Sequence, residues 1–444
     1  MFDALPIPAR RFYLLFALIG AIAFALAALL GDSVRLAAGW GVWGVGNTAL
    51  AIATVWDARR SRPDRPTLHR QELERLSVGR ENRIVLEIDG GDRGAIADIY
   101  DDRPHGFEGS TLPLRTSIRP HERQQLAYTV TPSSRGEFPW GDLYVRQLSR
   151  GQLAWQQWRV PQPTTAAVYP DLNGLRSLSV KLAVQSSGTL RQALRRGAGT
   201  EFAELREYVT GDDPRFIDWK ATARRGTPLV RVLEPEQEQT LIVLLDRGRL
   251  MTAQVRGLSR FDWGLNATLS LALAGIHRGD RVGVGVFDRR MHVWIPPERG
   301  TKHLPHLIER LTPIQPVLME PDYLGAATQL VQQQSRRALV VVITDIVDTT
   351  ASAELLTAMS RLTPRYLPLC VALRDPEVDR RAHGFTTAVD AAFERAVAID
   401  LLAQRQVAFA TLKQQGVLVL DTPADGISET LVDRYLQLKA RNRI

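Results

Sequence analysis

The C-terminal half of the chain alternates continuous apolar runs with longer amphipathic stretches. Uninterrupted apolar runs of this kind are typical of strands in a parallel sheet that is buried on both faces. One amphipathic stretch predicts a helix that begins at Ser259, with Asp262 completing a capping box, and ends at Gly279. The candidate strands are 241–246, 281–288, 339–345, 366–375 and 417–421. This pattern predicts a doubly wound α/β domain over residues 238–444.

Residues 75–165 follow a different pattern, in which apolar and polar positions alternate with a period of two. Short segments such as RIVLEID, QQLAYTVTP and GDLYVRQL are separated by turn clusters that include DGGDRG and SSRGEFPWG. Period-two alternation with regular turns predicts a small antiparallel β-sandwich.

Two uncharged apolar stretches precede this module, at 12–30 and 36–55, with only GDSVR between them. At about 1.5 Å per residue, the first stretch nearly crosses a hydrocarbon layer about 30 Å thick. We therefore expect a transmembrane helical hairpin within residues 1–60, and the arginines at 10, 11, 59, 60 and 62 place both of its ends in the cytosol. The alternative is a signal peptide cleaved after ALA at 26–28, but its apolar region is long and a second apolar stretch follows at once.

The composition excludes few functional classes. The chain has 56 Lys and Arg against 48 Asp and Glu, a net charge of +8, and its basic stretches lack the regularly spaced aromatics that stack nucleic-acid bases. We therefore expect no nucleic-acid partner. The single cysteine, Cys370, lies in an apolar run and is expected to be buried, so no disulfide can form within the chain.

An aspartate ends each of the five candidate strands. In an open α/β sheet, ligands bind beyond the carboxyl ends of the strands, and clustered carboxylates suit a hard cation such as Mg²⁺. Asp246 and Asp345 are the pair best suited to a shared site. Acids also follow strands simply because they form turns, which is the simpler interpretation for the other three, Asp288, Asp375 and Asp421.

Acids, bases and aromatics are densest at 201–224, within a segment at 190–236 that joins the two domains. Phe202, Leu205 and Val209 have helical spacing, and a second helix is expected from Pro214, capped by Asp213, to residue 224. On that helix Arg215 would pair with Asp218 or stack on Trp219. The segment could be a salt-bridged connector, a docking surface for a partner or an enzyme site. No histidine, cysteine or phosphate-binding loop accompanies it.

The run GAGTEFAELREYVTGDDPRFIDWKATAR resembles the signature of the bacterial domain of unknown function 58 family. The matching residues are Gly197, Gly199, Glu201, Phe202, Leu205, Arg206, Tyr208, Gly211, Asp212, Arg215, Ile217, Asp218, Trp219, Ala223 and Arg224. The resemblance implies a multi-pass protein of the bacterial inner membrane with a cytoplasmic C-terminal region. It also implies a C-terminal domain similar to the von Willebrand factor A fold, and association with an AAA+ ATPase of the MoxR type.

Von Willebrand A domains commonly bind a divalent ion through a D-x-S-x-S motif, a later threonine and a later aspartate. Here the motif begins with Asp246, but Gly248 and Leu250 replace its serines, and Asp345 fits the later aspartate. Mg²⁺ at a degenerate site of Asp246 and Asp345 is therefore an open expectation, and Arg247 and Arg249 could oppose or replace the ion.

These observations favour a non-catalytic inner-membrane adaptor that binds a protein partner, with the signature residues Glu201, Arg206, Tyr208, Gly211, Asp212, Arg215, Asp218, Trp219 and Arg224 serving structure or binding. One alternative is a membrane-bound hydrolase that uses Asp212, Asp218 or Glu201 as general acid and base. Another is a structural protein of envelope assembly, which would make its contacts through the β module.

Overall fold

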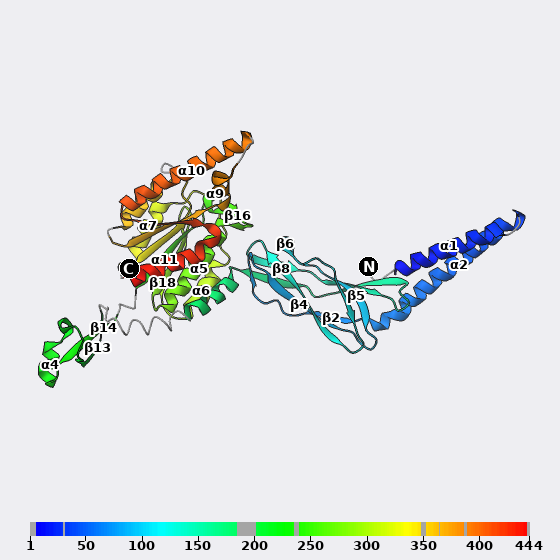
Figure 1. The fold of residues 1–444 in the computed structure, drawn as a ribbon, viewed down its shortest axis with the longest axis horizontal. Helices are drawn as coiled ribbons and strands as arrows, with labels where there is room; N and C mark the ends of the chain where they lie inside the picture. Colours follow the sequence, from blue (N-terminus) through cyan, green and yellow to red (C-terminus); the bar gives the residue numbers. More distant parts are fainter. Residues whose placement is uncertain are drawn as a thin grey trace. The chain divides into compact units, whose positions relative to one another are not determined.

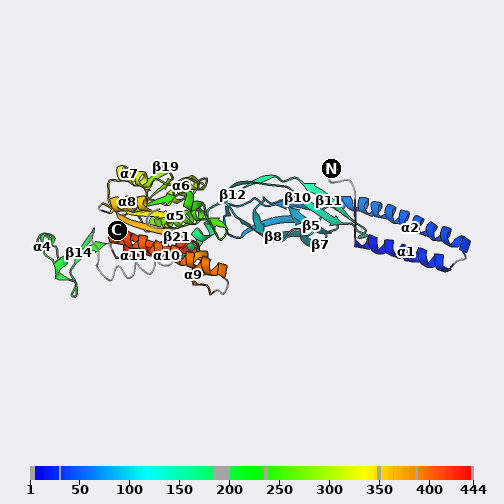
Figure 2. The ribbon, with the colours of Figure 1, turned by 90° about the horizontal axis from the view of Figure 1, so that it is seen from above.

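The computed structural model describes residues 6–29, 32–183, 201–234, 239–347, 352–363, 365–385 and 389–441 (Figures 1 and 2). The chain divides into two compact units, Met1–Val168 and Tyr169–Ile444. It is a mixed α/β protein, and each unit is described below by itself. Gly197 and Gly199 of the signature lie outside the described residues.

The first unit begins with a pair of packed helices, α1 (Arg10–Leu29) and α2 (Asp32–Ser61). Gly46 allows them to approach closely, because a Cβ atom there would lie 2.8 Å from the side chain of Ile19. The rings of Phe16 and Trp43 meet edge to face across the pair. The expected hairpin is therefore present.

Only one candidate membrane span occurs among the described residues, Arg10–Ala28 within α1, so the expectation of two is not met. Large apolar side chains such as Leu18, Ile22 and Phe24 are exposed on α1, which indicates membrane association. The sequence of α2 is less apolar than that of α1, because glycines, Asn47 and Thr48 lie among its apolar residues.

A β-sandwich completes the first unit. Its five-stranded sheet has the order β1-β11-β10-β5-β7, and the other sheets have the orders β2-β4-β8-β6 and β3-β12-β9. Neighbours such as β4 and β8, or β10 and β11, run antiparallel, and buried and more exposed residues alternate along β4. The bounds are β1 Ile7–Pro8, β2 Thr67–Arg70, β3 Leu76–Ser77, β4 Asn82–Asp89, β5 Ala95–Asp101, β6 Phe107–Gly109, β7 Leu114–Ile118, β8 Arg123–Pro132, β9 Gly136–Trp140, β10 Leu143–Leu148, β11 Ala154–Val160 and β12 Thr164–Tyr169.

Helix α2 is bonded directly to this sandwich. The carboxylate of Asp57, which is buried, accepts hydrogen bonds from the hydroxyl of Ser149 at 2.5 Å and the backbone N–H of Gly151 at 2.8 Å. One turn later the hydroxyl of Ser61 accepts from the backbone N–H of Arg150 at 3.1 Å. The chain before α1 also pairs with the sandwich, since β1 joins β11. Both ends of the hairpin are thus held by the same sheet.

The second unit is built on a six-stranded sheet with the order β19-β18-β15-β20-β21-β22. All neighbours are parallel except β18 and β19, which form an antiparallel edge. The bounds are β15 Thr240–Asp246, β18 Arg281–Phe287, β19 Met291–Glu298, β20 Leu339–Thr344, β21 Leu367–Arg374 and β22 Leu418–Pro423. The five strands expected from the apolar runs are all present, and Cys370 is buried in β21 as expected.

Helices cover both faces of this sheet. On one face α5 (Arg260–His277), α6 (His303–Leu311) and α11 (Ile427–Ala440) pack against side chains that include Val243 and Leu245. On the other face α7 (Tyr323–Gln333), α8 (Ala353–Leu362) and α10 (Val389–Gln414) pack against Ile242 and Leu244. Figure 1 shows α7 and α10 on the side of the sheet opposite α5, α6 and α11. The expected capping box at Ser259 is formed on α5, and α9 (Pro376–His383) contacts α10. Residues 172–183 are also helical.

The signature segment is a hairpin with a short helical insert. Strand β13 (Glu201–Glu207) pairs antiparallel with β14 (Leu229–Glu234), and a 3₁₀ turn (Pro214–Phe216) and α4 (Trp219–Arg225) lie between them. The prediction of a helix from Phe202, Leu205 and Val209 is therefore wrong, because residues 201–207 form a strand. The second expected helix is split at Asp218, because this residue has an extended backbone and serves as the N-cap of α4. Shorter elements are η1 Arg62–Asp64, η3 Arg249–Thr252, β16 Gln254–Val255, β17 Leu258–Ser259 and η4 Ala424–Gly426.

Candidate functional site

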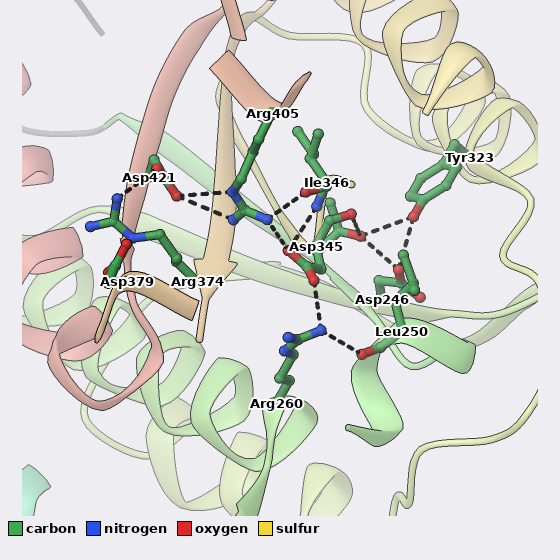
Figure 3. Close-up of polar contacts among 11 residues, drawn as sticks. Asp246, Leu250, Arg260, Tyr323, Asp345, Ile346, Arg374, Asp379, Arg405 and Asp421 are labelled. Carbon is green, nitrogen blue, oxygen red and sulfur yellow. Dashed lines mark hydrogen bonds and ion pairs between the residues drawn. The ribbon is translucent and has the colours of Figure 1, made fainter. Parts of the chain in front are cut away.

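The carboxyl ends of β15, β20 and β22 bring three aspartates to one edge of the α/β sheet (Figure 3). Strands β15 and β20 are parallel neighbours with Leu245 opposite Ile343, so Asp246 and Asp345 follow on adjacent strands. Asp421 lies in β22, beyond β21. This is the edge at which open α/β sheets bind their ligands.

Asp246 is fully buried and accepts hydrogen bonds on both carboxylate oxygens. Its Oδ1 accepts from the backbone N–H of Gly248 at 2.6 Å, and its Oδ2 accepts from the hydroxyls of Thr344 at 2.7 Å and Tyr323 at 3.0 Å. Burial raises the pKa of Asp246 to about 6, and the nearby charge of Asp345 adds to the rise although the three hydrogen bonds oppose it. Asp246 therefore titrates close to neutral pH.

Asp345 lies between two arginines that come from different elements. Nη1 of Arg405, in α10, donates to Oδ1 at 2.6 Å, and Nη1 of Arg260, at the start of α5, donates to Oδ2 at 2.6 Å. The backbone N–H of Ile346 also donates to Oδ1 at 2.9 Å. Because Asp345 and Arg405 are both buried, this is an ion pair shielded from water.

The charged network continues to the next strand and to α9. Nη2 of Arg405 donates to Asp421 at 3.1 Å, and Arg374 lies 3.5 Å from the other oxygen of Asp421 and 3.0 Å from Asp379 in α9. Burial lowers the pKa of Arg405, but the charges of Asp345 and Asp421 outweigh burial and the pKa is raised overall. Arg405 is therefore a permanent cation between two strand-end carboxylates.

Of the three aspartates assigned to turns, Asp288 and Asp375 do shape turns, but the interpretation is wrong for Asp421, which lies within β22 and pairs with two arginines. Asp288 accepts from Arg247 at 2.9 Å and from the backbone N–H of Arg290 in the β18–β19 hairpin. Asp375 is the N-cap of α9 and accepts from the backbone N–H of Glu377.

The donor set at this edge does not fit a divalent cation. Among the residues that the structure describes, no three His, Cys, Asp or Glu side chains are grouped so that they could hold one. Both oxygens of Asp345 are bonded to guanidinium groups, and Gly248 and Leu250 supply no hydroxyl. An ion between Asp246 and Asp345 would have to displace two arginines from short contacts. Neither of the arginines suspected from sequence is involved, since Arg247 pairs with Asp288 and Arg249 pairs with Glu320.

In the signature segment, each described aspartate is paired within the hairpin. Asp212 accepts two bonds from Arg206, at 2.6 and 2.8 Å, and Asp213 pairs with Arg215 at 2.7 Å. The hydrogen bond from Arg206 holds the pKa of Asp212 below its usual range, as that from Arg215 does for Asp213. The expected pair of Arg215 with Asp218 is therefore replaced by a local one.

Asp218 has a structural role at the start of α4. Its Oδ1 accepts from the backbone N–H groups of Lys220 and Ala221, and its Oδ2 accepts from Arg231 of β14 at 2.9 Å. The bond from Ala221 is the main cause of the lowered pKa of Asp218. Trp219 is exposed at the start of the same helix.

Three other signature residues are described by their backbone contacts or by their place in the hairpin. Tyr208 donates its N–H to the carbonyl of Pro228, Gly211 has a φ of 114° that favours glycine, and Arg224 lies in the last turn of α4. The side chain of Glu201 lies outside the part of the chain whose side chains are described.

Comparison with known proteins gives a family match for about half of the chain. Residues 204–415 match the family model described as "Protein of unknown function DUF58". An uncharacterized protein of Mycobacterium tuberculosis is 25% identical over 176 residues, which cover 38% of this chain and 56% of that protein. The uncharacterized protein YeaD of Bacillus subtilis is 25% identical over 142 residues, which cover 32% of this chain and 33% of that protein. The chain thus spans about half the length of the mycobacterial relatives that it matches.

Two solved structures are also similar over 46% of this chain and 99% of their own. They are BatB of Bacteroides thetaiotaomicron, 14% identical with a TM-score of 0.32, and an aerotolerance-related membrane protein of Bacteroides fragilis, 12% identical with a TM-score of 0.31. These TM-scores are too low to support a conclusion.

Proposed function

Because residues 204–415 carry the domain of unknown function 58, as the signature indicated, we propose that this chain is a non-catalytic adaptor anchored in the bacterial inner membrane. Its α/β unit, which we take to be a von Willebrand factor A-like domain, binds a protein partner. The partner that the family resemblance implies is an AAA+ ATPase of the MoxR type.

The observation that carries this proposal is an exposed apolar stripe on the first half of α10. Val389, Phe393 and Val397 follow one another at intervals of four residues and are 71%, 69% and 68% exposed. Residues at this spacing share one face of a helix, so the three side chains form a continuous exposed apolar stripe. The second half of α10 is packed on the sheet through Ala408, Phe409 and Leu412. A contiguous apolar surface of this kind is the usual signature of a protein-binding site, and a helix face that inserts into a partner's groove is a common mode.

Charge at the sheet edge supports binding rather than chemistry. A general acid or base needs an accessible carboxyl whose pKa is tuned to its task, beside a cavity that admits substrate. At this edge Asp345 and Asp421 are bonded to arginines, and the accessible aspartates of the signature have lowered pKa values. The lowered pKa values keep the signature aspartates ionised at neutral pH, and Asp246, whose pKa is raised, is fully buried and so not accessible to a substrate. This arrangement favours an adaptor over a hydrolase.

The proposed location rests on the first unit. The exposed apolar surface of α1, the one candidate span among the described residues, would hold this unit in the membrane, with α2 packed against α1 in the hairpin. Arg59 and Arg60, in the last turn of α2, favour a cytoplasmic position for the residues that follow.

Copurification tests the adaptor function. The full-length chain, tagged and solubilised in detergent, is mixed with the MoxR-type ATPase of the same bacterium and recovered on affinity resin. We expect the ATPase to be retained by the wild type and lost from a Phe393→Ser/Val397→Ser variant. Val180→Ser is a matched control, because Val180 is also exposed, at 67%. It lies in the helix of residues 172–183, which packs through Leu178 and Leu182 on the face of the sheet opposite α10. Failure of the wild type to retain the ATPase would contradict the proposed partner.

A role in envelope assembly is the second candidate, and one feature of the sandwich favours it. The exposed side of β5, β10 and β11 forms a groove of about 410 Å³ that is lined by Tyr100, Tyr144 and Arg146. Paired aromatic side chains on a sheet can hold an extended polypeptide. Crosslinks to a membrane protein from residues 75–165, with none from α10, would support this role over the adaptor.

A further inference from the structure

From the contacts at the sheet edge we infer that Arg260 and Arg405 take the place of a divalent cation. Their guanidinium groups supply two fixed positive charges to the carboxylate of Asp345, one on each oxygen, and Arg405 bridges from there to Asp421 (Figure 3). A divalent ion at a strand-end site would supply the same charge at the same place. The edge is therefore cation-independent.

Charge balance supports this exchange. The network contains three paired carboxylates, of Asp345, Asp421 and Asp379, and three guanidinium groups, of Arg260, Arg374 and Arg405. The charges of these six groups cancel without an ion, and the carboxyl of Asp246, which is outside this set, accepts three hydrogen bonds instead. Any added cation near Asp345 would lie beside two guanidinium groups and would be repelled by both.

The arginines are also built into the fold. Arg405 is only 6% exposed, its guanidinium lies 5.4 Å from the ring centroid of Phe409, and Nη1 donates to the carbonyl of Ile346 as well as to Asp345. Arg260 is held at the N-terminal turn of α5, where its Nη1 also lies 3.5 Å from the carbonyl of Leu250. Unlike a bound ion, neither cation can be removed by a chelator.

This exchange has a consequence for partner binding, which rests on the proposed function. Where a metal ion supplies the charge, a partner carboxylate can become one of its ligands, and binding depends on the ion's concentration. Here the charge is covalently part of the chain. Docking beside this edge should proceed equally well with Mg²⁺ and with a chelator.

Mn²⁺ titration of the full-length chain in detergent tests the inference. We expect no saturable binding by the wild type at millimolar Mn²⁺. An Arg260→Met/Arg405→Met variant should bind Mn²⁺ saturably, with an apparent Kd at least about tenfold below that of the wild type. The reason is that removal of both cations leaves Asp345 beside Asp246 without compensation. Arg247→Met is the matched control, because Arg247 pairs with Asp288 and touches neither carboxylate. It should behave as the wild type does.

Two results would overturn the inference. One is saturable Mn²⁺ binding by the wild type that Asp246→Asn or Asp345→Asn abolishes, and the other is a folded double variant that binds no Mn²⁺. If the double variant does not fold, the wild type decides alone: its melting temperature should be the same in Mg²⁺ and in chelator, and a rise with Mg²⁺ that Asp345→Asn removes would refute the exchange. Failure of the wild type to retain the ATPase, with the Mn²⁺ results as expected, would contradict only the proposed function.

Discussion

Replacing Asp246 by asparagine should make the α/β unit less sensitive to pH. Asparagine keeps the size of the side chain and an oxygen that can accept a hydrogen bond, but it does not titrate. The hydroxyls of Thr344 and Tyr323, which donate to Asp246 now, can rotate to accept from an amide. The variant should therefore fold as the wild type does.

The magnitude follows from the pKa of Asp246, which is about 6 in the folded chain and 3.8 for an ordinary aspartate. Between these values the folded state holds a proton that the unfolded chain has lost, so this group's contribution to stability is largest below pH 4 and falls as pH rises through 6. A shift of about two units, at about 1.4 kcal/mol per unit, amounts to about 3 kcal/mol. Relative to the wild type, Asp246→Asn should gain about 3 kcal/mol of stability between pH 4 and 7.

Hydrogen exchange in peptides from β15 and β20 measures this difference within the α/β unit. At each pH the variant is compared with the wild type, so the intrinsic pH dependence of exchange cancels. The opening equilibrium of the variant should fall by about a hundredfold relative to the wild type from pH 4 to pH 7, because tenfold corresponds to about 1.4 kcal/mol. A ratio that stays constant over this range would refute the assignment of a raised pKa to Asp246.

Three further substitutions test other contacts. Arg405→Met should lower the free energy of unfolding by about 3 to 5 kcal/mol. The loss should lie toward the lower end of this range because Asp345 keeps its ion pair with Arg260. Denaturant unfolding measures it, and a loss below about 1 kcal/mol would contradict the prediction. Asp57→Ala leaves the hydroxyl of Ser149 and the backbone N–H of Gly151 without their acceptor, at a cost of about 1 to 3 kcal/mol. Proteolysis where α2 meets the sandwich should therefore become faster. An unchanged cleavage rate would argue against a firm junction. Asp218→Ala should weaken exchange protection in α4 whereas Asp218→Asn should retain it, and lost partner binding with full protection would instead make Asp218 a contact residue.

The sheet of the α/β unit could be predicted because its strands are buried on both faces, so each strand is a continuous apolar run that needs no alternation of polar and apolar residues to be recognised. Every residue of β20 is buried, and most of β15 is too, so a continuous apolar run was sufficient to locate each strand. The capping box of α5 could be read in the same direct way, since its bonds join residues three apart. Local signals of this kind survive without knowledge of the tertiary structure.

Strand β13 could not be predicted in this way, for a physical reason. Its pairing with β14 shifts register between Phe202 and Glu204, so an extra residue interrupts the alternation of faces. The apolar positions then fall at spacings of three and four, which imitate a helix. The partner strand lies more than 20 residues away in the sequence, beyond the reach of any local pattern.

Arg405 shows how part of the site escaped sequence reasoning. It lies 60 residues from Asp345, with which it pairs, so no motif connects them. A signal was nevertheless present, because Arg405 lies four residues before Phe409 and seven before Leu412, on the apolar face of α10. A charged residue on the buried face of a helix must have a partner, and the unpaired strand-end aspartates were the obvious acceptors.

The junction at Asp57 has a mechanical consequence. The helical pair and the five-stranded sheet share hydrogen bonds and a strand pairing, so the junction is fixed at two places. A rotation of α2 about its own axis would therefore act directly on residues 149–151, which lie between β10 and β11. Torque generated in the bilayer could in this way reach the sandwich without being dissipated in a linker.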